Sequence, residues 1–327
     1  MVQPQIRYDD GAAYERMMGA WSRIAGEIFL DWLAPPPGLR WIDVGCGSGA
    51  FTELLVERCA PAEVQGIDPS EAQLSFARAR PAGRIAKFHR GDVLALPFGE
   101  DNFDAAVMAL VIFFVPDPTK GVAEMARVVR PGGTVATYVW DMMGGGHPLE
   151  LMHAELHAMG FAAPRPPRSD VSGVEALRSL WINADLDAVE VREITVHRTF
   201  ADFDDFWTTS MMSATVSQTI AAMAPGDAEL LKMRMRARLP ADVAGRITHG
   251  ARANAIRGRV LTVNSSPAPI FRPPRRSVRI IGAAEDRDFL MHVHIGIMRA
   301  LNRHVERVFD TSRKDKDWGP WKLARDR

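Results

Sequence analysis

A glycine-rich loop is the first feature of the sequence whose residue types and spacing could do chemistry. Asp43-Val44-Gly45-Cys46-Gly47-Ser48-Gly49-Ala50 follows an apolar run and precedes a helical pattern. Glycines at such a junction allow a tight turn and let a ligand approach the backbone closely. The loop fits both G-x-G-x-G and G-x-G-x-x-A, and dinucleotide-binding domains also use the second pattern. The next acid, Asp68, ends the second apolar run. A carboxylate there would accept hydrogen bonds from ribose hydroxyls, which predicts an adenosine-containing ligand.

Three further features indicate whether this adenosine site is a dinucleotide site or binds another adenosine-containing cofactor. Asp43 precedes the glycines, where dinucleotide folds usually have an apolar residue. Gly91-Asp92-Val93-Leu94-Ala95-Leu96-Pro97-Phe98 follows the third apolar run, Phe103-Asp104 opens the fourth, and Arg130-Pro131-Gly132-Gly133 precedes the fifth. With these motifs in this order, residues 14–140 resemble the class I S-adenosylmethionine-dependent methyltransferases. Within that class they are similar to the small-molecule group of the ubiquinone/menaquinone-biosynthesis C-methyltransferases (methyltransferase type 11 group).

The resemblance implies S-adenosyl-L-methionine as cofactor and a role for each loop. The three loop glycines would run past the methionine part of the cofactor, Asp68 would bind the ribose diol, and Asp92 would accept from the adenine amine. The cofactor-binding residues that the resemblance implies are Asp43, Gly45, Cys46, Gly47, Gly49, Asp68, Pro69, Asp92, Val93, Ala109 and Leu110. Cys46 is interpreted as a small filler of the loop rather than a nucleophile, because nothing nearby in the sequence would lower its pKa. Residues 109–114 are all apolar, so no catalytic base is predicted there.

Apolar runs that alternate with helical patterns must position these loops. Continuous apolar runs are typical of parallel strands that helices cover on both faces. We expect strands at 40–44, 64–67, 85–88, 103–111, 134–140, 189–200 and 247–260. We expect helices at 12–33, 51–59, 70–80, 121–129, 174–186 and over 202–240. The predicted fold is α/β: a Rossmann-like, doubly wound, mostly parallel seven-stranded sheet with helices on both faces, plus a helical lid, insertions and a C-terminal extension.

Charged residues are distributed unevenly along the chain. The sequence has 40 Lys and Arg against 40 Asp and Glu, but residues 265–327 have 14 basic against 8 acidic residues. This stretch starts Pro-rich and continues as an amphipathic helical pattern with a basic stripe at 285–309, which could contact a partner or a membrane surface, or dock on the body. The expected organisation is a methyltransferase domain at 1–262, with a lid helix at 12–33 and substrate-side insertions at 142–172 and 201–240, and a basic Pro-rich linker and helical tail at 263–327.

Composition excludes several classes of protein. Overall neutrality and an acidic body argue against a nucleic-acid partner. Two cysteines exclude a disulfide scaffold, and no apolar run approaches the ~20 residues of a membrane-spanning helix. The first eight residues lack the apolar region of a signal peptide. We therefore expect a cytoplasmic protein with a small-molecule substrate and no transmembrane segment.

Methionine and aromatic side chains outside the loop predict an apolar or aromatic methyl acceptor. The candidate pocket residues are Tyr14, Trp21, Trp140, Met142, His147, Phe206, Trp207 and Met211. His153 and His157 are four residues apart on an expected helix, a spacing that would suit a metal ion. One of His147, His153 and His157 could also act as a base in the substrate pocket. His-Ala-Glu-Leu-His is not the H-E-x-x-H zinc pattern, so no metal is predicted.

The predicted function is transfer of a methyl group from S-adenosyl-L-methionine to a carbon or oxygen of a small molecule by in-line displacement. Proximity and orientation alone can supply roughly 7–11 kcal/mol of the barrier, so an acid–base pair is optional. Two alternatives stay open. The apolar segment after the fourth strand favours a catalytically inactive cofactor-binding or scaffold protein, and the glycine loop alone would also suit an NAD-dependent oxidoreductase.

Overall fold

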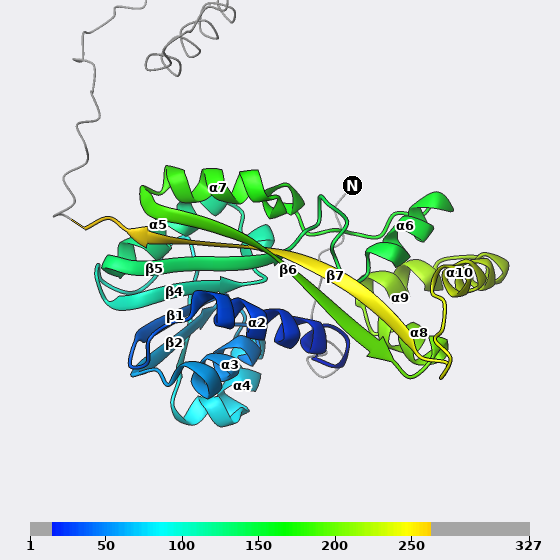
Figure 1. The fold of residues 1–327 in the computed structure, drawn as a ribbon, viewed down its shortest axis with the longest axis horizontal. Helices are drawn as coiled ribbons and strands as arrows, with labels where there is room; N and C mark the ends of the chain where they lie inside the picture. The colour runs from blue at the N-terminus through cyan, green and yellow to red at the C-terminus, as the bar shows by residue number, and fades with distance from the viewer. Residues whose placement is uncertain (1–14, 263–327) are drawn as a thin grey trace, which may run out of the picture. The chain divides into compact units, whose positions relative to one another are not determined.

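Seven strands form one mostly parallel sheet in the computed structural model of the protein, which describes residues 15–262. The strand order is β3-β2-β1-β4-β5-β7-β6, with β1 to β5 parallel and β7 antiparallel to both of its neighbours (Figure 1). The strands are β1 (Arg40–Val44), β2 (Glu63–Asp68), β3 (Lys87–Arg90), β4 (Phe103–Ala109), β5 (Val129–Trp140), β6 (Leu186–Phe200) and β7 (Ile247–Val260). The predicted doubly wound α/β fold is confirmed.

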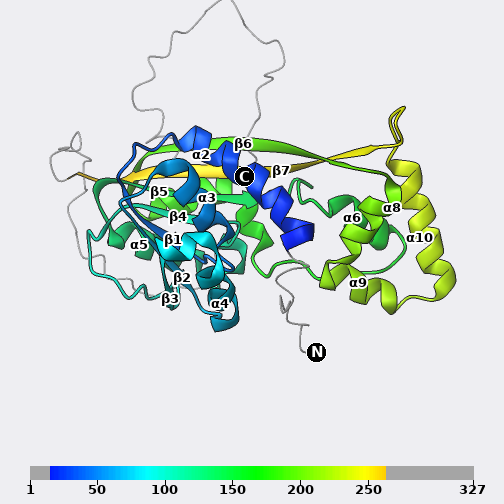
Figure 2. The same ribbon diagram turned by 90° about the horizontal axis from the view of Figure 1, so that it is seen from below.

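Helices cover both faces of this sheet. α2 and α3 pack together on one face, and α5 and α7 pack together on the other (Figure 1, Figure 2). Strands covered on both sides bury all their side chains, which explains the unbroken apolar runs of β1 and β4. The helical segments are η1 (Glu15–Gly19), α2 (Ala20–Leu33), α3 (Ala50–Cys59), α4 (Glu71–Ala79), η2 (Pro81–Arg84), η3 (Ile112–Phe114), α5 (Pro118–Val128), α6 (Glu150–Ala158), η4 (Ser169–Ser172), α7 (Val174–Asn183), α8 (Phe203–Met211), α9 (Ala214–Ala221) and α10 (Pro225–Arg238).

Local sequence signals explain where several helices begin and end. Ser70 caps α4, because its side chain accepts a hydrogen bond from the backbone N–H of Gln73. Asp117 caps α5 in the same way, and Pro118 occupies the first turn, where its missing N–H is not needed. α2 ends at Ala34, whose φ of 44° is left-handed, directly before the three prolines.

Several element boundaries differ from the sequence prediction. The third strand begins at Lys87 rather than at residue 85, because Ile85 closes the preceding turn with a hydrogen bond to Ala82. The turn expected at Arg130–Gly133 lies inside β5, and the helix expected to reach Leu186 ends at Asn183. The region 202–240, expected to be helical, consists of three helices, and the last of them begins at Pro225, a residue that fits only the first turn of a helix.

The paired strands β6 and β7 extend well beyond the rest of the sheet. β5 pairs with β7 only as far as Trp140 and Ala253, whereas β6 and β7 stay paired from Leu186 and Val260 to Phe200 and Ile247. The extension, residues 194–200 and 247–253, is called the ribbon here. It leads from the carboxyl edge of the sheet to α8 (Figure 1, Figure 2).

A group of helices, called the cap here, consists of α6, α8, α9 and α10. α8 contacts α9, and α6 contacts α10. At the second contact the carboxylate of Glu155 on α6 lies 2.8 Å from Arg234 and 2.7 Å from Arg238 of α10. Glu155 is 5% exposed, so the two guanidinium groups compensate a carboxylate that is largely removed from water.

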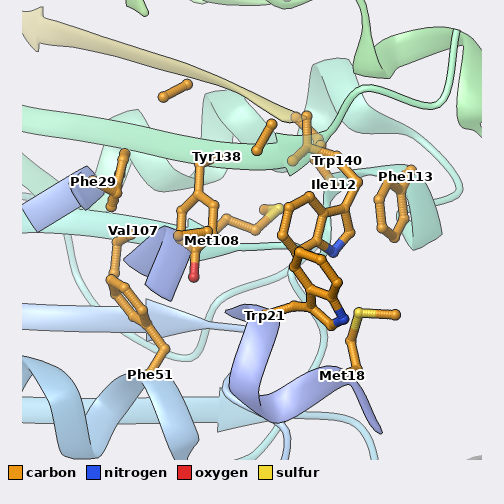
Figure 3. Packing of buried hydrophobic residues seen from close by; sticks show 14 of the residues in the cluster. Met18, Trp21, Phe29, Phe51, Val107, Met108, Ile112, Phe113, Tyr138 and Trp140 are labelled. Atoms are coloured by element: carbon orange, nitrogen blue, oxygen red, sulfur yellow. The ribbon is translucent and has the colours of Figure 1, made fainter. Parts of the chain in front are cut away.

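Two predicted features fall wholly or partly outside the described residues. Tyr14 and the basic tail at 263–327 lie outside them, so the pocket role of Tyr14 and the domain boundary stay predictions. The described part of the expected lid helix is helical, with a short π-helical segment, η1, that continues into α2. Met18 and Trp21 of this segment belong to the same buried apolar cluster as Trp140 at the end of β5 (Figure 3).

Candidate functional site

The loop between β1 and α3 turns sharply over the end of β2. The backbone N–H groups of Gly45 and Cys46 both donate to the carbonyl of Ile67, at 2.8 and 3.0 Å. Gly45 has φ of +74°, and a Cβ there would lie 2.5 Å from a methyl group of Val111. Glycine is therefore required at this position by both backbone conformation and space. The close approach also shows that the loops after β1 and β4 meet, at the point where the strand order reverses and α/β proteins bind ligands.

Gly47 lies at the open side of this loop. Its φ is +53°, and a Cβ built on it would meet nothing within 4 Å. Its N–H donates to Asp68 Oδ2 at 3.0 Å. The glycine is thus held by its backbone, with empty space where a side chain would stand, which is the arrangement that a closely approaching ligand needs.

Asp43 lies beneath the loop and is fully buried. Its Oδ2 accepts a hydrogen bond of 2.6 Å from the hydroxyl of Thr52 on α3, whereas Oδ1 is buried without a partner. Burial raises the pKa of this carboxyl from 3.8 to about 7, against the opposing effect of the Thr52 hydrogen bond. An unpartnered carboxylate oxygen at such depth indicates that a donor belongs beside it.

Asp68 connects the glycine loop to the start of α4. Oδ2 accepts from Gly47, and Oδ1 accepts from the N–H of Ser70 at 2.8 Å. Burial raises the pKa of this carboxyl, and the two backbone N–H groups act against that rise. A carboxylate offers about four acceptor positions, so roughly two remain for a ligand.

Cys46 fills space inside the loop. The side chain is 7% exposed, and burial raises the pKa of its thiol, with Asp43 and Asp68 adding to the rise. A thiol that keeps its proton is a poor nucleophile, which agrees with its interpretation as a filler. Arg80, which the sequence analysis missed, braces the same loop by donating to the Ser48 carbonyl and to Glu53, both at 2.7 Å.

The loops after β3 and β4 supply the other predicted cofactor contacts. Asp92 is exposed, and its Oδ1 accepts from the N–H of Leu94 at 2.9 Å, which leaves its other oxygen available. Leu110 follows β4 with φ of +60°, held there by a hydrogen bond of 2.8 Å from its N–H to the carbonyl of Tyr138. A branched residue in the left-handed region is strained, and such strain gathers at ligand sites.

Several predicted acceptor-pocket residues come together where the first helix meets the ribbon and the cap. Trp21 packs edge-on against His249 at 5.8 Å, and His249 packs against Phe206 at 5.9 Å. Phe200 joins both, at 6.5 Å from Trp21 and 5.2 Å from Phe206. The sequence analysis missed Phe200 and His249. Both lie in predicted strands, and one face of those strands packs against the cap.

The remaining pocket predictions lie around this aromatic cluster. Met142 is buried just beyond β5, and its N–H donates to the hydroxyl of Ser172 at 3.0 Å. Trp207 instead stacks on Phe203 within α8 and lies under Lys232 of α10, which places it at a contact inside the cap. The pocket role of Trp207, like that of partly buried Met211, stays a prediction.

His147 and His153 lie face to face, with ring centroids 5.5 Å apart and planes within 9°. Burial lowers the pKa of His147 to about 3 and that of His153 to about 4, and the charge of Arg165 adds to both shifts. Both rings are therefore neutral near pH 7. His157, on the same helix, is exposed.

The described residues, 15–262, offer no cluster of metal ligands, and they form a cleft away from the predicted site. Within this part of the chain no three His, Cys, Asp or Glu residues are grouped to hold a metal ion, and no helix is long and apolar enough to cross a membrane. A cleft of about 200 Å³ lies at the amino edge of the sheet, lined by Trp41, Arg130 and Arg257 among others. It lies away from every residue predicted for the site, which is at the carboxyl edge.

The part of the chain that forms the carboxyl edge of the sheet matches a known protein family. Residues 42–137 match the family described as a methyltransferase domain. These residues run from within β1 to Thr137 of β5 and include Asp43, Asp68 and Asp92. Residues 42–137 therefore resemble a methyltransferase domain, and the resemblance seen in the sequence is confirmed.

Individual relatives agree with the family match. The chain is 38% identical over 149 residues to the 2-phytyl-1,4-naphtoquinone methyltransferase of Synechococcus elongatus, covering 44% of this chain and 61% of that protein. It is 34% identical over 142 residues to the ubiquinone/menaquinone biosynthesis C-methyltransferase UbiE of Paracoccus denitrificans, covering 42% of this chain and 56% of that one. An uncharacterized protein of Mycobacterium tuberculosis is 34% identical over 48% of this chain and 53% of its own length. The matched region thus spans between half and two thirds of each relative.

One solved structure resembles this chain over a longer stretch than the sequence relatives do. The YcgJ protein from Bacillus subtilis superposes with a TM-score of 0.50 at 17% sequence identity, covering 73% of this chain and 98% of that one. At this identity the likeness concerns the fold alone.

Proposed function

We propose that the protein transfers a methyl group from S-adenosyl-L-methionine to a carbon or oxygen atom of a small, apolar or aromatic acceptor. The buried carboxylate of Asp43 is the observation on which this proposal rests. Its Oδ1 has no partner, and a buried carboxylate is expected to be paired. The cofactor's amino group is a positively charged donor that would supply the missing interaction, directly or through a water molecule.

The other loop residues fit the same ligand. The empty space at Gly47 would let the methionine part pass close to the backbone. Asp68 keeps acceptor capacity for the two ribose hydroxyls, since only two of its positions are used by Gly47 and Ser70. Asp92 keeps one carboxylate oxygen for the adenine amine. The match to a methyltransferase domain supports this assignment.

The residues of this chain would contribute binding, orientation and exclusion of water. When bound, the cofactor supplies a methyl group that its sulfonium already activates. Asp43 and Asp68 would fix the donor, and the apolar residues 111–114 that follow β4 would keep water from it. Ile112 and Phe113 are buried there, so the segment forms an apolar wall. Holding both reactants in line is worth roughly 7–11 kcal/mol, which agrees with the absence of an acid–base pair among residues 109–114.

The aromatic cluster supports an apolar or aromatic acceptor. Trp21, Phe206 and His249 bring aromatic rings together from three separate elements. Flat aromatic walls suit a planar ring, because stacked and edge-to-face contacts add to simple burial. The relatives named as quinone methyltransferases agree with this acceptor class.

Calorimetry with S-adenosylhomocysteine tests the proposal. The wild-type protein should bind it, and Asp68→Ala should weaken binding at least tenfold while circular dichroism shows an unchanged fold. Glu229→Ala, an exposed acid on α10, is the matched control and should bind like wild type. Affinity unchanged by Asp68→Ala, or binding of NAD(H) in place of S-adenosylhomocysteine, would contradict the assignment. Labelled S-adenosylmethionine incubated with a metabolite extract then identifies the acceptor by the molecule that gains the label.

A further inference from the structure

The cleft at the amino edge of the sheet has one row of residues as its floor. Trp41 of β1 is opposite Ala105 of β4, Ala105 is opposite Thr134 of β5, and Thr134 is opposite Arg259 of β7. Residues that lie opposite each other on neighbouring strands point to the same face of a sheet. All four line the cleft. The small side chains of Ala105 and Thr134 therefore form a hollow between an indole and a guanidinium group.

One wall of the cleft is apolar. Leu33, the last residue of α2, lines it together with Pro35, Pro36 and Leu39 from the connection to β1. Arg257 ties this wall to the sheet by donating to the carbonyl of Leu33 at 3.2 Å. The volume of about 200 Å³ equals that of about seven water molecules in the liquid. It is below the ~300 Å³ at which sites for drug-sized ligands begin, so it suits a single ring or a short chain.

Three arginines line the cleft, and two of them are paired with acids that also line it. Arg130 pairs with Asp104 at 2.6 Å, and Arg257 pairs with Glu190 at 2.9 Å. Arg259 is the third. Among residues 15–262 no carboxylate forms an ion pair with Arg259. The lining of the cleft thus has one positive charge more than it has negative charges.

The guanidinium group of Arg259 keeps most of its donors. Its Nη1 donates to the carbonyl of Gly132 at 3.1 Å, and a guanidinium group has five N–H donors. Asp187 is the register partner of Arg259 on β6, but its carboxylate accepts the N–H of Ala188 instead. Arg259 is exposed, and an exposed guanidinium group is hydrated, so its charge alone does not indicate a ligand.

Two other donors in the same row add to that charge. Nε1 of Trp41 is buried without a partner, whereas a buried indole N–H is usually hydrogen-bonded. The hydroxyl of Thr134 is partly buried, and the described part of the chain supplies no hydrogen-bond partner for it. The row therefore combines an indole N–H, a hydroxyl and a guanidinium group. An occupant that brings acceptor oxygens and a negative charge complements all three kinds of group.

We propose that this cleft binds a small organic carboxylate with one apolar ring or short chain. Arg259 holds the carboxylate, with which a guanidinium group forms two parallel hydrogen bonds, and Thr134 donates a third. The apolar part of the ligand lies along Leu33 and Leu39. An inorganic anion would leave this apolar wall uncovered. The cleft is at the opposite edge of the sheet from Asp43 and the glycine loop, so this inference does not rest on the proposed methyl transfer.

Benzoate and benzamide test the proposal, because they have the same size and differ in charge. Ligand-observed NMR titration of the full chain measures the dissociation constant of each. Wild type should bind benzoate at least tenfold more tightly than benzamide. Arg259→Gln removes the charge, so it should weaken benzoate about tenfold and change benzamide less than twofold. Thr134→Val keeps the shape of the side chain without its hydroxyl and should weaken benzoate about threefold.

Controls locate the site and separate it from the proposed function. Arg84→Gln, an exposed change outside the cleft, should leave both affinities at the wild-type value, and all variants should share the thermal unfolding midpoint of wild type. Equal wild-type affinities for the two probes, or a benzoate preference that Arg259→Gln retains, would overturn the proposal. So would competition between benzoate and S-adenosylhomocysteine, or inorganic phosphate that binds as tightly as benzoate. Failure of wild type to bind S-adenosylhomocysteine overturns the proposed function and leaves this inference intact.

Discussion

Replacing Asp43 by asparagine separates what this carboxylate costs the fold from what it contributes to binding. The pKa of the carboxyl is 3.8 when unfolded and about 7 when folded, because burial disfavours the charged form. Between these values the folded state binds more protons than the unfolded state, so wild-type stability falls as pH rises from about 4 to 7. A difference of about three pKa units corresponds to about 4 kcal/mol at pH 8 and about 2 kcal/mol at pH 5.

Asp43→Asn removes this titration and keeps an acceptor oxygen for Thr52. The variant amide has an N–H₂ group where Oδ1 stood, and an unpartnered buried donor costs about 1–3 kcal/mol at every pH. Because this cost does not change with pH, the pH dependence of the free energy of unfolding reports the titration of Asp43 alone. The difference in free energy of unfolding, variant minus wild type, should increase by about 2–3 kcal/mol between pH 5 and pH 8. At pH 8 the variant should also bind S-adenosylhomocysteine at least tenfold more weakly.

Urea unfolding at pH 5, 6, 7 and 8 measures this difference, and calorimetry at pH 8 measures the affinity. Asp104→Asn is the control, because Arg40 and Arg130 hold the pKa of Asp104 at about 2. Its effect should stay constant from pH 5 to pH 8. A stability difference for Asp43→Asn that is flat over this range would refute the argument from burial. A stability gain without loss of affinity would refute the role of Asp43 in binding the cofactor.

Two other perturbations follow from the geometry. Gly49→Ala should destabilise the fold by about 1–3 kcal/mol, because φ is +79° and the new Cβ would lie 2.9 Å from Ala77 Cβ; Gly99→Ala, with open space around it, is the control in the same urea titration. His153→Leu should stabilise the protein at pH 8, and its advantage over wild type should grow by about 2 kcal/mol by pH 5. The His153 imidazole takes up a proton near pH 6.5 in the unfolded chain and only near 4 in the folded one, so its own contribution weakens the wild type in acid and is missing from the variant. Equal advantages at both pH values would contradict that shift.

The cofactor half of the molecule was predictable because its signals are local. The glycines of 45–49, Asp68 at the end of β2 and the cap at Ser70 each depend on a few neighbouring residues. The apolar runs of β1 and β4 likewise predict their own burial. The alternation of such runs with helical patterns predicted a mostly parallel sheet.

The acceptor half depends on contacts between distant residues, which a single sequence does not reveal. Phe200 and His249 meet Trp21 across more than 170 positions, and only the pairing of β6 with β7 brings them there. Thr52 was missed as the partner of Asp43 because a threonine in a helix usually indicates nothing about a ligand. The histidines were noticed as a possible metal pair or base, but only the structure shows that His147 stacks on His153.

The ribbon gives the fold a means of adjusting the distance between its two halves. β6 and β7 stay in register for several residues beyond the point where β5 ends, and α8 begins three residues after β6. Each residue of a strand adds about 3.3 Å, and side-chain facing is preserved only when residues are added in pairs on both strands. Acceptors of different length could thus be accommodated in steps of about 7 Å without any change in the loops that are predicted to hold the methyl donor. The length of the ribbon would then determine which acceptor sizes fit.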